Sequence, residues 1–365
     1  MSQAETAARR ERLLARRAQL SEERRLQLER RLLGDLPPAA GAGAPGLLVE
    51  ITPVPPRPGG ASTTAAAARR PLFCVHPAGG DVLCFVPLAR WLGADQPCFG
   101  LRSHGLEAGE EPLRSIEEMA SRYVAEVRQA QPVGPYLLAG WSFGGLAAFE
   151  MAQQLVAAGE QVALLAIVDT PPGLAGAAAV DGGGEPVRGA GEPADGAGEL
   201  AGGAGDLADG AGQDLAPWLL AIADYVRGLW GRDLGLGAAD LAGRDPESQL
   251  RLFVERARRA EMLHHAGSLE QVRRLLAVFR ANAGAYRAYR PRPYPGPIAV
   301  FRAAAAEQAS APDLGWGRFA AAPVASREVP GDHLTLFAEP HVRSLADQLR
   351  AAIDGVPPST GDTRR

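Results

Sequence analysis

The chain has 365 residues and a formal net charge of only −4, so its composition does not suggest nucleic-acid binding. All 38 basic residues are arginine, which excludes a P-loop, a Schiff-base lysine and a serine–lysine dyad. The N-terminus has no apolar signal region, and no segment approaches ~18 consecutive apolar residues, so we expect a cytoplasmic protein without a membrane span. The three cysteines lie in or near apolar runs and are expected to be buried hydrophobes, not a disulfide framework or a metal site.

The N-terminal region is predicted to lie outside the main domain. Residues 5–34 are rich in arginine and glutamate and carry leucines in a pattern typical of one or two amphipathic helices. We therefore predict a helical arm over 1–35, which is either a docking segment or a solvated arm. Residues 36–70 are rich in Pro, Gly, Ala and Thr and are predicted to form a flexible linker.

Short apolar runs then alternate with helical patterns. The runs that predict strands cover residues 72–76, 98–101, 136–139 and 162–168, and the helical patterns cover 83–92, 115–129 and 145–158. Strands that alternate with helices indicate an α/β fold, in which a mostly parallel sheet is covered by helices on both faces.

The next region breaks this alternation. Residues 176–213 are almost all Gly, Ala, Asp, Glu and Pro without an aromatic residue, and we expect them to be disordered because they cannot bury enough apolar surface. A helical stripe then follows at Trp218, Ile222, Tyr225 and Leu229.

The helical pattern continues over 247–263 and 268–288. Two last strands are predicted over 297–302 and 324–329, followed by a closing helix over 338–353 and a disordered tail over 356–365. Residues 171–296 therefore form a mostly helical insertion, placed to act as a lid because ligands of open α/β folds bind beyond the carboxyl ends of the strands.

The pentapeptide Gly140–Gly144 has the pattern G-x-S-x-G between a predicted strand and a predicted helix. That context is typical of a nucleophile elbow, in which a strained turn exposes the serine hydroxyl above the sheet. The helix N-terminus is also directed at the site where negative charge develops. Ser142 is therefore a candidate for covalent acyl transfer.

A serine nucleophile needs a base and an acid, which follow it in the order Ser, acid, His in α/β-hydrolases. His333 is the favoured base because it follows the last predicted strand and precedes the final helix. Asp169 is the favoured acid because it ends the strand after the nucleophile, although it could instead cap a turn. Asp313 is its main rival, since it follows the next strand.

Two backbone N–H groups are expected to hold the oxyanion. One belongs to Phe143, and the other belongs to Ala78, or alternatively to Gly79, in the loop after the first strand of the main domain. Apolar side chains of the lid could contact an apolar substrate chain or simply pack in the core. The substrate candidates among them are Trp218, Tyr225 and Trp230.

Four segments together resemble the type I thioesterase domains of nonribosomal peptide and polyketide synthases. The matching residues are Phe73–Gly80, Gly134–Gly145, Ile167–Thr170 and Val329–His333, and the resemblance extends over about 70 to 355. It implies an α/β-hydrolase fold over 71–355 with a helical lid inserted at 171–296. It also implies the triad Ser142, Asp169 and His333.

The resemblance further implies a substrate and a partner. The family takes an acyl or peptidyl chain from the phosphopantetheine thioester of an acyl or peptidyl carrier protein, with no cofactor bound by the enzyme itself. The chain leaves by hydrolysis or by ring closure in the biosynthesis of secondary metabolites such as antibiotics. Leu20–Arg25 and Leu28–Leu32 resemble helical segments at the start of synthase modules, so residues 5–34 could dock an upstream module and the protein could act in trans. The alternatives are a type II-like editing thioesterase and a non-catalytic module that binds carrier proteins.

Overall fold

The computed structural model describes residues 46–52, 69–173, 214–260, 262, 269–305 and 311–356. All of them belong to one unit, Gly46–Arg365. The arm predicted over 1–35, the disordered stretch predicted over 176–213 and the tail after residue 356 lie outside the described residues.

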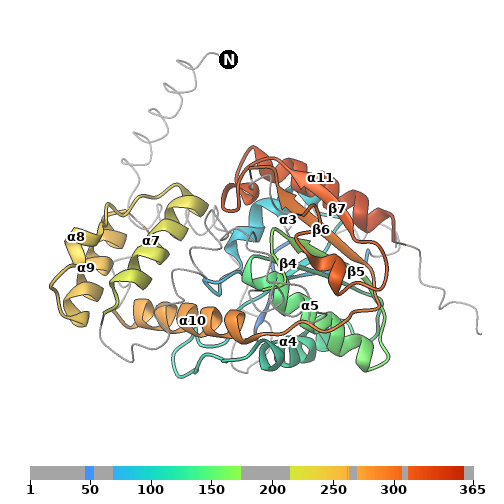
Figure 1. The fold of residues 1–365 in the computed structure, drawn as a ribbon, viewed down its shortest axis with the longest axis horizontal. Coiled ribbons are helices and arrows are strands. Elements are labelled where there is room, and N and C mark those ends of the chain that lie inside the picture. Colours follow the sequence, from blue (N-terminus) through green and yellow to red (C-terminus); the bar gives the residue numbers. More distant parts are fainter. Residues whose placement is uncertain are drawn as a thin grey trace, which may run out of the picture. The chain divides into compact units, whose positions relative to one another are not determined.

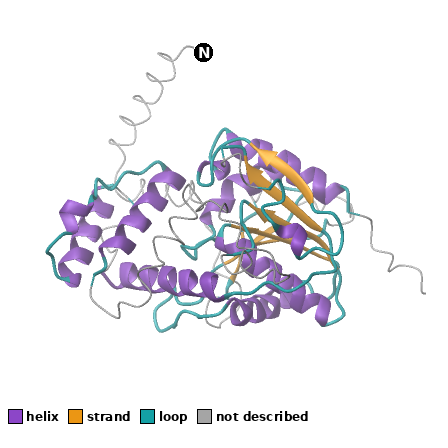
Figure 2. Ribbon diagram, viewed as in Figure 1, coloured by secondary structure: helices purple, strands orange, loops and turns teal. Residues whose placement is uncertain are grey.

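The described residues form a seven-stranded sheet in the order β1-β3-β2-β4-β5-β6-β7 (Figures 1 and 2). β1 is antiparallel to β3, and every other neighbouring pair is parallel. The strands are β1 (Leu48–Glu50), β2 (Leu72–Val75), β3 (Cys98–Leu101), β4 (Tyr136–Trp141), β5 (Val162–Val168), β6 (Ile298–Ala303) and β7 (Ala325–Val329). The fold class and the six strands predicted from apolar runs are confirmed.

β1 corrects the prediction that residues 36–70 are only a linker. Its three residues pair with β3 at the edge of the sheet, and the flanking Leu47 and Ile51 are buried. A run this short carries too little alternation to indicate a strand by itself, because its existence depends on the neighbour that accepts it.

Successive side chains of the parallel strands point to opposite faces of the sheet and pack in two separate hydrophobic cores. In β2, Leu72 and Cys74 point to one face, whereas Phe73 and Val75 point to the other. The first face is covered by α3 (Val86–Leu92) and α11 (His341–Asp354), and the second by α4 (Ile116–Ala130) and α5 (Phe143–Ala157) (Figure 1). The four helices predicted for these positions are confirmed, except that residues 83–85 form a separate 3-10 turn, η1 (Leu83–Phe85).

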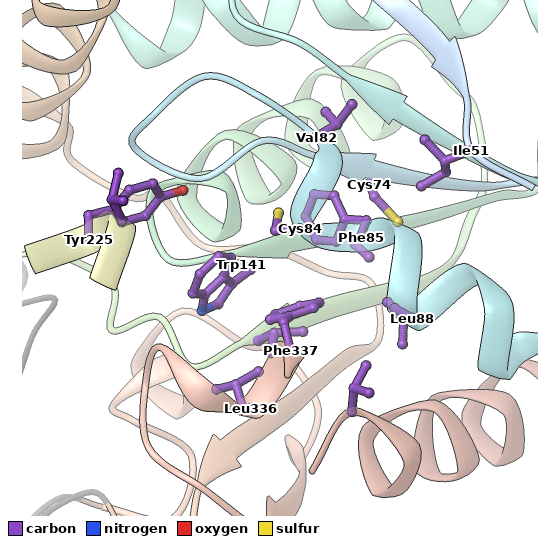
Figure 3. Close-up of a cluster of buried hydrophobic side chains, with 14 of the residues drawn as sticks. Ile51, Cys74, Val82, Cys84, Phe85, Leu88, Trp141, Tyr225, Leu336 and Phe337 are labelled. Atoms are coloured by element: carbon purple, nitrogen blue, oxygen red, sulfur yellow. The ribbon is translucent and has the colours of Figure 1, made fainter. Parts of the chain in front are cut away.

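The core on the first face extends from the sheet towards the inserted helices (Figure 3). Trp141, the last residue of β4, packs against Phe337 and Tyr225, with ring centroids 4.7 and 6.4 Å apart. All three cysteines are buried, as predicted, and their thiols are free. Burial raises the pKa of the Cys74 and Cys84 thiols well above the usual value, so they behave as apolar packing groups.

Four helices lie between β5 and β6 among the described residues, to the left of the sheet in Figure 1: α7 (Ala216–Trp230), α8 (Ala238–Leu241), α9 (Pro246–Arg259) and α10 (Leu269–Ala288). The apolar side chains of α7, α9 and α10 join the core of the first sheet face. α10 also contacts α5, the helix that follows the pentapeptide. No helix in the described part of the chain is both long and apolar enough to cross a bilayer.

Candidate active site

Ser142 occupies the sharp turn between β4 and α5. Its backbone has φ 55° and ψ −128°, a conformation that side-chain-bearing residues rarely adopt. The flanking glycines allow the backbone to pass closely, because a Cβ on Gly140 would lie 2.0 Å from the Gly144 carbonyl oxygen. A Cβ on Gly144 would lie 2.3 Å from the carbonyl oxygen of Val75. The turn therefore has the geometry that the pentapeptide predicts.

Three side chains from different segments form a continuous hydrogen-bonded line. His333 lies 3.1 Å from the Ser142 hydroxyl through Nε2 and 2.8 Å from Asp169 Oδ2 through Nδ1. Because a carboxylate only accepts, Nδ1 carries the proton, and in the neutral imidazole Nε2 is then the acceptor for the Ser142 Oγ–H. His333 and Asp169 are 7% and 8% exposed, so this line is shielded from water except near the hydroxyl.

Asp169 is held on its second oxygen by the sheet itself. The backbone N–H of Ala303, at the end of β6, donates to Oδ1 over 2.8 Å. Asp169 has a positive φ of 48°, which directs the residue out of the strand at its carboxyl end. Both carboxylate oxygens are thus fixed, and the orientation of the imidazole is fixed with them.

Asp313, the rival acid of the sequence analysis, lies in a different environment. Its two oxygens accept from the backbone N–H groups of Gly315 and Gly317, so it organises the turn before η3 (Trp316–Arg318). Asp332, next to His333 in the chain, likewise accepts from Leu334 and Thr335. The structure brings Asp169 to the imidazole and uses these two aspartates as turn caps.

A narrow cleft lies beside Ser142 and is partly open to solvent. Both predicted oxyanion residues, Ala78 and Phe143, line it together with the serine. Phe143 is the first residue of α5, so its N–H has no partner within the helix. Gly79, the alternative donor, packs instead against the ring of Tyr225 and lines a neighbouring cavity. This arrangement favours Ala78 over Gly79.

The loop that carries Ala78 is anchored by a second buried histidine. His76 is fully buried, with Nδ1 2.7 Å from the Pro77 carbonyl and Nε2 2.6 Å from the Tyr123 hydroxyl. Its ring stacks on Phe143 with a centroid separation of 5.6 Å. Burial lowers the pKa of His76 to about 4, despite an opposing effect of the Pro77 carbonyl, so the imidazole is neutral at pH 7.

The three apolar lid candidates have different positions. Trp218 is buried and packs against Phe279 at 6.5 Å, so it belongs to the core of the inserted helices. Tyr225 is also buried, but it lines the cavity beside Gly79 together with Trp230. Trp230 is 41% exposed and contacts the edge of the Tyr225 ring. None of the three lines the cleft beside Ser142.

The sequence analysis did not identify Asn282, a buried polar residue of the cleft. It lies within α10, is 1% exposed and donates from Nδ2 to the Ala78 carbonyl over 2.9 Å. A signal was available, because Asn282 is the only asparagine in the chain and stands inside a predicted helix. Asparagine is a poor residue for helix interiors, which favours a specific role for its side chain.

Comparisons with known proteins find similar sequences for part of this chain. Residues 70–181 match the family model described as the thioesterase domain. Malpinin synthetase of Mortierella alpina is 49% identical over 104 residues, which are 28% of this chain and 1% of the relative. The nonribosomal peptide synthetase pngA of Aspergillus terreus is 42% identical over 106 residues, which are 29% of this chain and 11% of the relative. The chain thus spans only a small part of these curated relatives. Other relatives include inactive atromentin synthetases of Paxillus involutus.

Solved structures extend the similarity to most of the chain. A four-domain nonribosomal peptide synthetase bound to AMP and glycine matches with a TM-score of 0.65 and 25% identity over 86% of this chain and 20% of that one. The Vlm2 thioesterase domain matches with a TM-score of 0.54 and 24% identity over 83% of this chain and 96% of that one, a likeness in fold.

The family match and the fold lead to one assignment. The matched residues include β2, the loop that follows it, the pentapeptide and Asp169, so they contain two of the three hydrogen-bonded residues. The family is one of hydrolases that act on thioesters. Residues 70–181 thus match the thioesterase domain family, within a chain that has the α/β-hydrolase fold and is similar to the type I domains of nonribosomal peptide synthetases.

Proposed function

We propose that this protein releases an acyl or peptidyl chain from the phosphopantetheine thioester of a carrier protein through an acyl-enzyme on Ser142. The observation that carries the proposal is the His333 imidazole, which joins the Ser142 hydroxyl to the Asp169 carboxylate. A serine hydroxyl is a poor nucleophile until a base removes its proton, and this arrangement supplies the base in the required tautomer.

The acylation step follows from these positions. Nε2 of His333 takes the Ser142 proton while Oγ attacks the thioester carbonyl, and Asp169 stabilises the imidazolium that forms. The N–H groups of Ala78 and Phe143 donate to the oxyanion, and the N-terminus of α5 adds its positive dipole end. The carbon–sulfur bond then breaks, and the imidazolium returns the proton to the leaving thiolate.

Deacylation repeats the same chemistry with a second nucleophile. The neutral His333 takes a proton from water, which gives hydrolysis, or from a hydroxyl or amine of the bound chain, which gives ring closure. The new tetrahedral oxyanion uses the same two donors. In this proposal the helices between β5 and β6 act as the lid over the cleft.

The carrier-bound substrate is proposed from the relatives. Those with the similar segment are named as synthetases, and the segment is about a tenth or less of their length. We infer that an acyl or peptidyl carrier protein presents the thioester, and that residues 5–34 can engage an upstream synthase module. Mass spectrometry of a carrier loaded with an acylated phosphopantetheine should show loss of the acyl group when the enzyme is added.

Labelling with a fluorophosphonate tests the serine directly. The wild-type protein should acquire one adduct, mapped to Ser142 by peptide mass spectrometry, and Ser142→Ala should remain unlabelled and inactive towards thioesters. Asp313→Asn serves as a matched control, because it changes a carboxylate outside the hydrogen-bonded line and should label normally. A covalent acyl adduct on Ser142→Ala, or no adduct on the wild type, contradicts the proposal.

A further inference from the structure

One buried oxygen beside Ser142 lacks a hydrogen-bond donor. Asn282 directs Nδ2 at the Ala78 carbonyl over 2.9 Å, which fixes the orientation of the amide because a carbonyl oxygen can only accept. Its Oδ1 is therefore the acceptor end. This oxygen is buried and has no hydrogen-bond partner among the described residues.

Two other polar residues that line the cleft, Thr170 and Asp169, are already engaged. The Thr170 hydroxyl lies 2.8 Å from the Ser142 carbonyl and 2.9 Å from that of Val168, to which it can donate. Both oxygens of Asp169 accept, one from Ala303 and one from His333. Among the described lining residues, Asn282 Oδ1 is thus the buried side-chain oxygen left unpaired.

We propose that Asn282 is a positioning residue whose Oδ1 accepts a hydrogen bond from an amide N–H of the thioester substrate. The proposal rests on the proposed function and names the substrate chemistry of the same cleft. A buried acceptor that stays unpaired in the complex weakens binding, so the cleft favours a substrate that supplies a donor. The N–H belongs to the acyl chain or to the cysteamine part of the pantetheine arm.

The same side chain connects substrate binding to the oxyanion site. Nδ2 holds the carbonyl of Ala78, the residue whose own N–H is the proposed oxyanion donor. An amide N–H on Oδ1 holds the Asn282 side chain in this orientation and thereby supports the loop. Asn282 touches no reacting atom in this scheme, and it acts through the position of the substrate and of Ala78.

Four model thioesters test the inference. The acyl part is either an N-acetylaminoacyl group or its analogue with CH₂ in place of N–H, and the thiol part is either N-acetylcysteamine or butanethiol. For the acyl part, the thiol part or both, the wild type should have a kcat/KM about tenfold or more higher for the thioester with the amide than for its matched analogue without it. Asn282→Leu, which keeps the volume but has no acceptor, should reduce that preference to near one. If Asn282→Leu loses the preference for the amide in the acyl part, the N–H comes from the acyl chain. If it loses the preference for N-acetylcysteamine, the N–H comes from the pantetheine arm.

Asn282→Asp separates the two ends of the amide. One of its two oxygens keeps an acceptor at the position of Asn282 Oδ1, so the preference for the amide substrate should survive while kcat falls for all four thioesters, because a carboxylate repels the Ala78 carbonyl and the oxyanion. Equal preferences in the wild type and Asn282→Leu overturn the inference and leave the Ser142 chemistry intact. Failure of the wild type to turn over any of the four thioesters refutes the proposed function and the inference together.

Discussion

Two buried histidines lie beyond the carboxyl ends of strands in this sheet, yet their partners give them different chemistry. His76 follows β2 and contacts a carbonyl and a phenol, whereas His333 follows β7 and contacts a carboxylate and the hydroxyl of Ser142. Burial lowers the pKa of the His76 imidazole. Of the two, only His333 contacts a carboxylate, and only His333 contacts the Ser142 hydroxyl at the cleft.

The comparison shows how one residue type is divided between structure and chemistry. His76 connects the oxyanion loop to α4 through Tyr123, and its neutral ring stacks on Phe143. The position of one proposed oxyanion donor therefore depends on a histidine that need not titrate during turnover. The variants below should separate the two roles, from the largest expected effect to the smallest.

His333→Ala should give the largest loss. Removing the base should lower kcat for thioester hydrolysis about 10⁴-fold or more, because the hydroxyl then has no proton acceptor. The melting temperature should change little compared with the loss in kcat. Steady-state assays with a soluble thioester, paired with thermal unfolding, check both statements, and near-normal kcat would remove His333 from the mechanism.

Asp169→Asn should give the next largest loss of kcat. We expect kcat to fall about 10²–10⁴-fold, since the amide neither stabilises the imidazolium nor fixes the required tautomer. Asp313→Asn should stay within about twofold, because its oxygens only cap a turn away from the imidazole. The two variants are compared by kcat with one substrate, and the opposite ranking would transfer the acid role to the later strand.

His76 should make the unfolding free energy depend on pH. Its pKa falls from 6.5 to about 4 on folding, so the unfolded chain binds more protons between these values and stability is lost as the pH falls through this window. The full shift corresponds to about 3 kcal/mol of unfolding free energy. Denaturant titrations at pH 7 and pH 4.5 should show a larger loss for the wild type than for His76→Gln. Equal losses would mean that His76 does not titrate differently in the folded state.

Tyr123→Phe should have the smallest effect. It leaves the Nε2 acceptor of His76 unpaired in the core and should reduce the unfolding free energy by about 1–2 kcal/mol. Because Tyr123 does not line the cleft, kcat should remain within about twofold of the wild type. A large fall in kcat without loss of stability would show that the His76–Tyr123 pair acts in catalysis and not as a support.

Long-range pairing explains most of what the sequence analysis missed. β1 is three residues long and is a strand because β3 offers it an edge, so residues 36–70 looked like a linker throughout. Asn282 stands in a correctly predicted helix, but only the packing of α10 over the loop brings its amide to Ala78. Trp218, Tyr225 and Trp230 all belong to α7, yet they differ in burial and none lines the cleft.

The sequence by itself determined the alternation of strands and helices, the strained turn at Ser142 and the order in which the three polar residues follow one another. These features are local, since they depend on apolar periodicity, glycine spacing and the residue that ends a strand. Only the tertiary structure decided that Asp169 and not Asp313 meets His333, across 164 positions of the chain. The physical reason is that hydrogen-bond partners are selected by how the strands and loops pack in space, and distance along the chain carries no information about that packing.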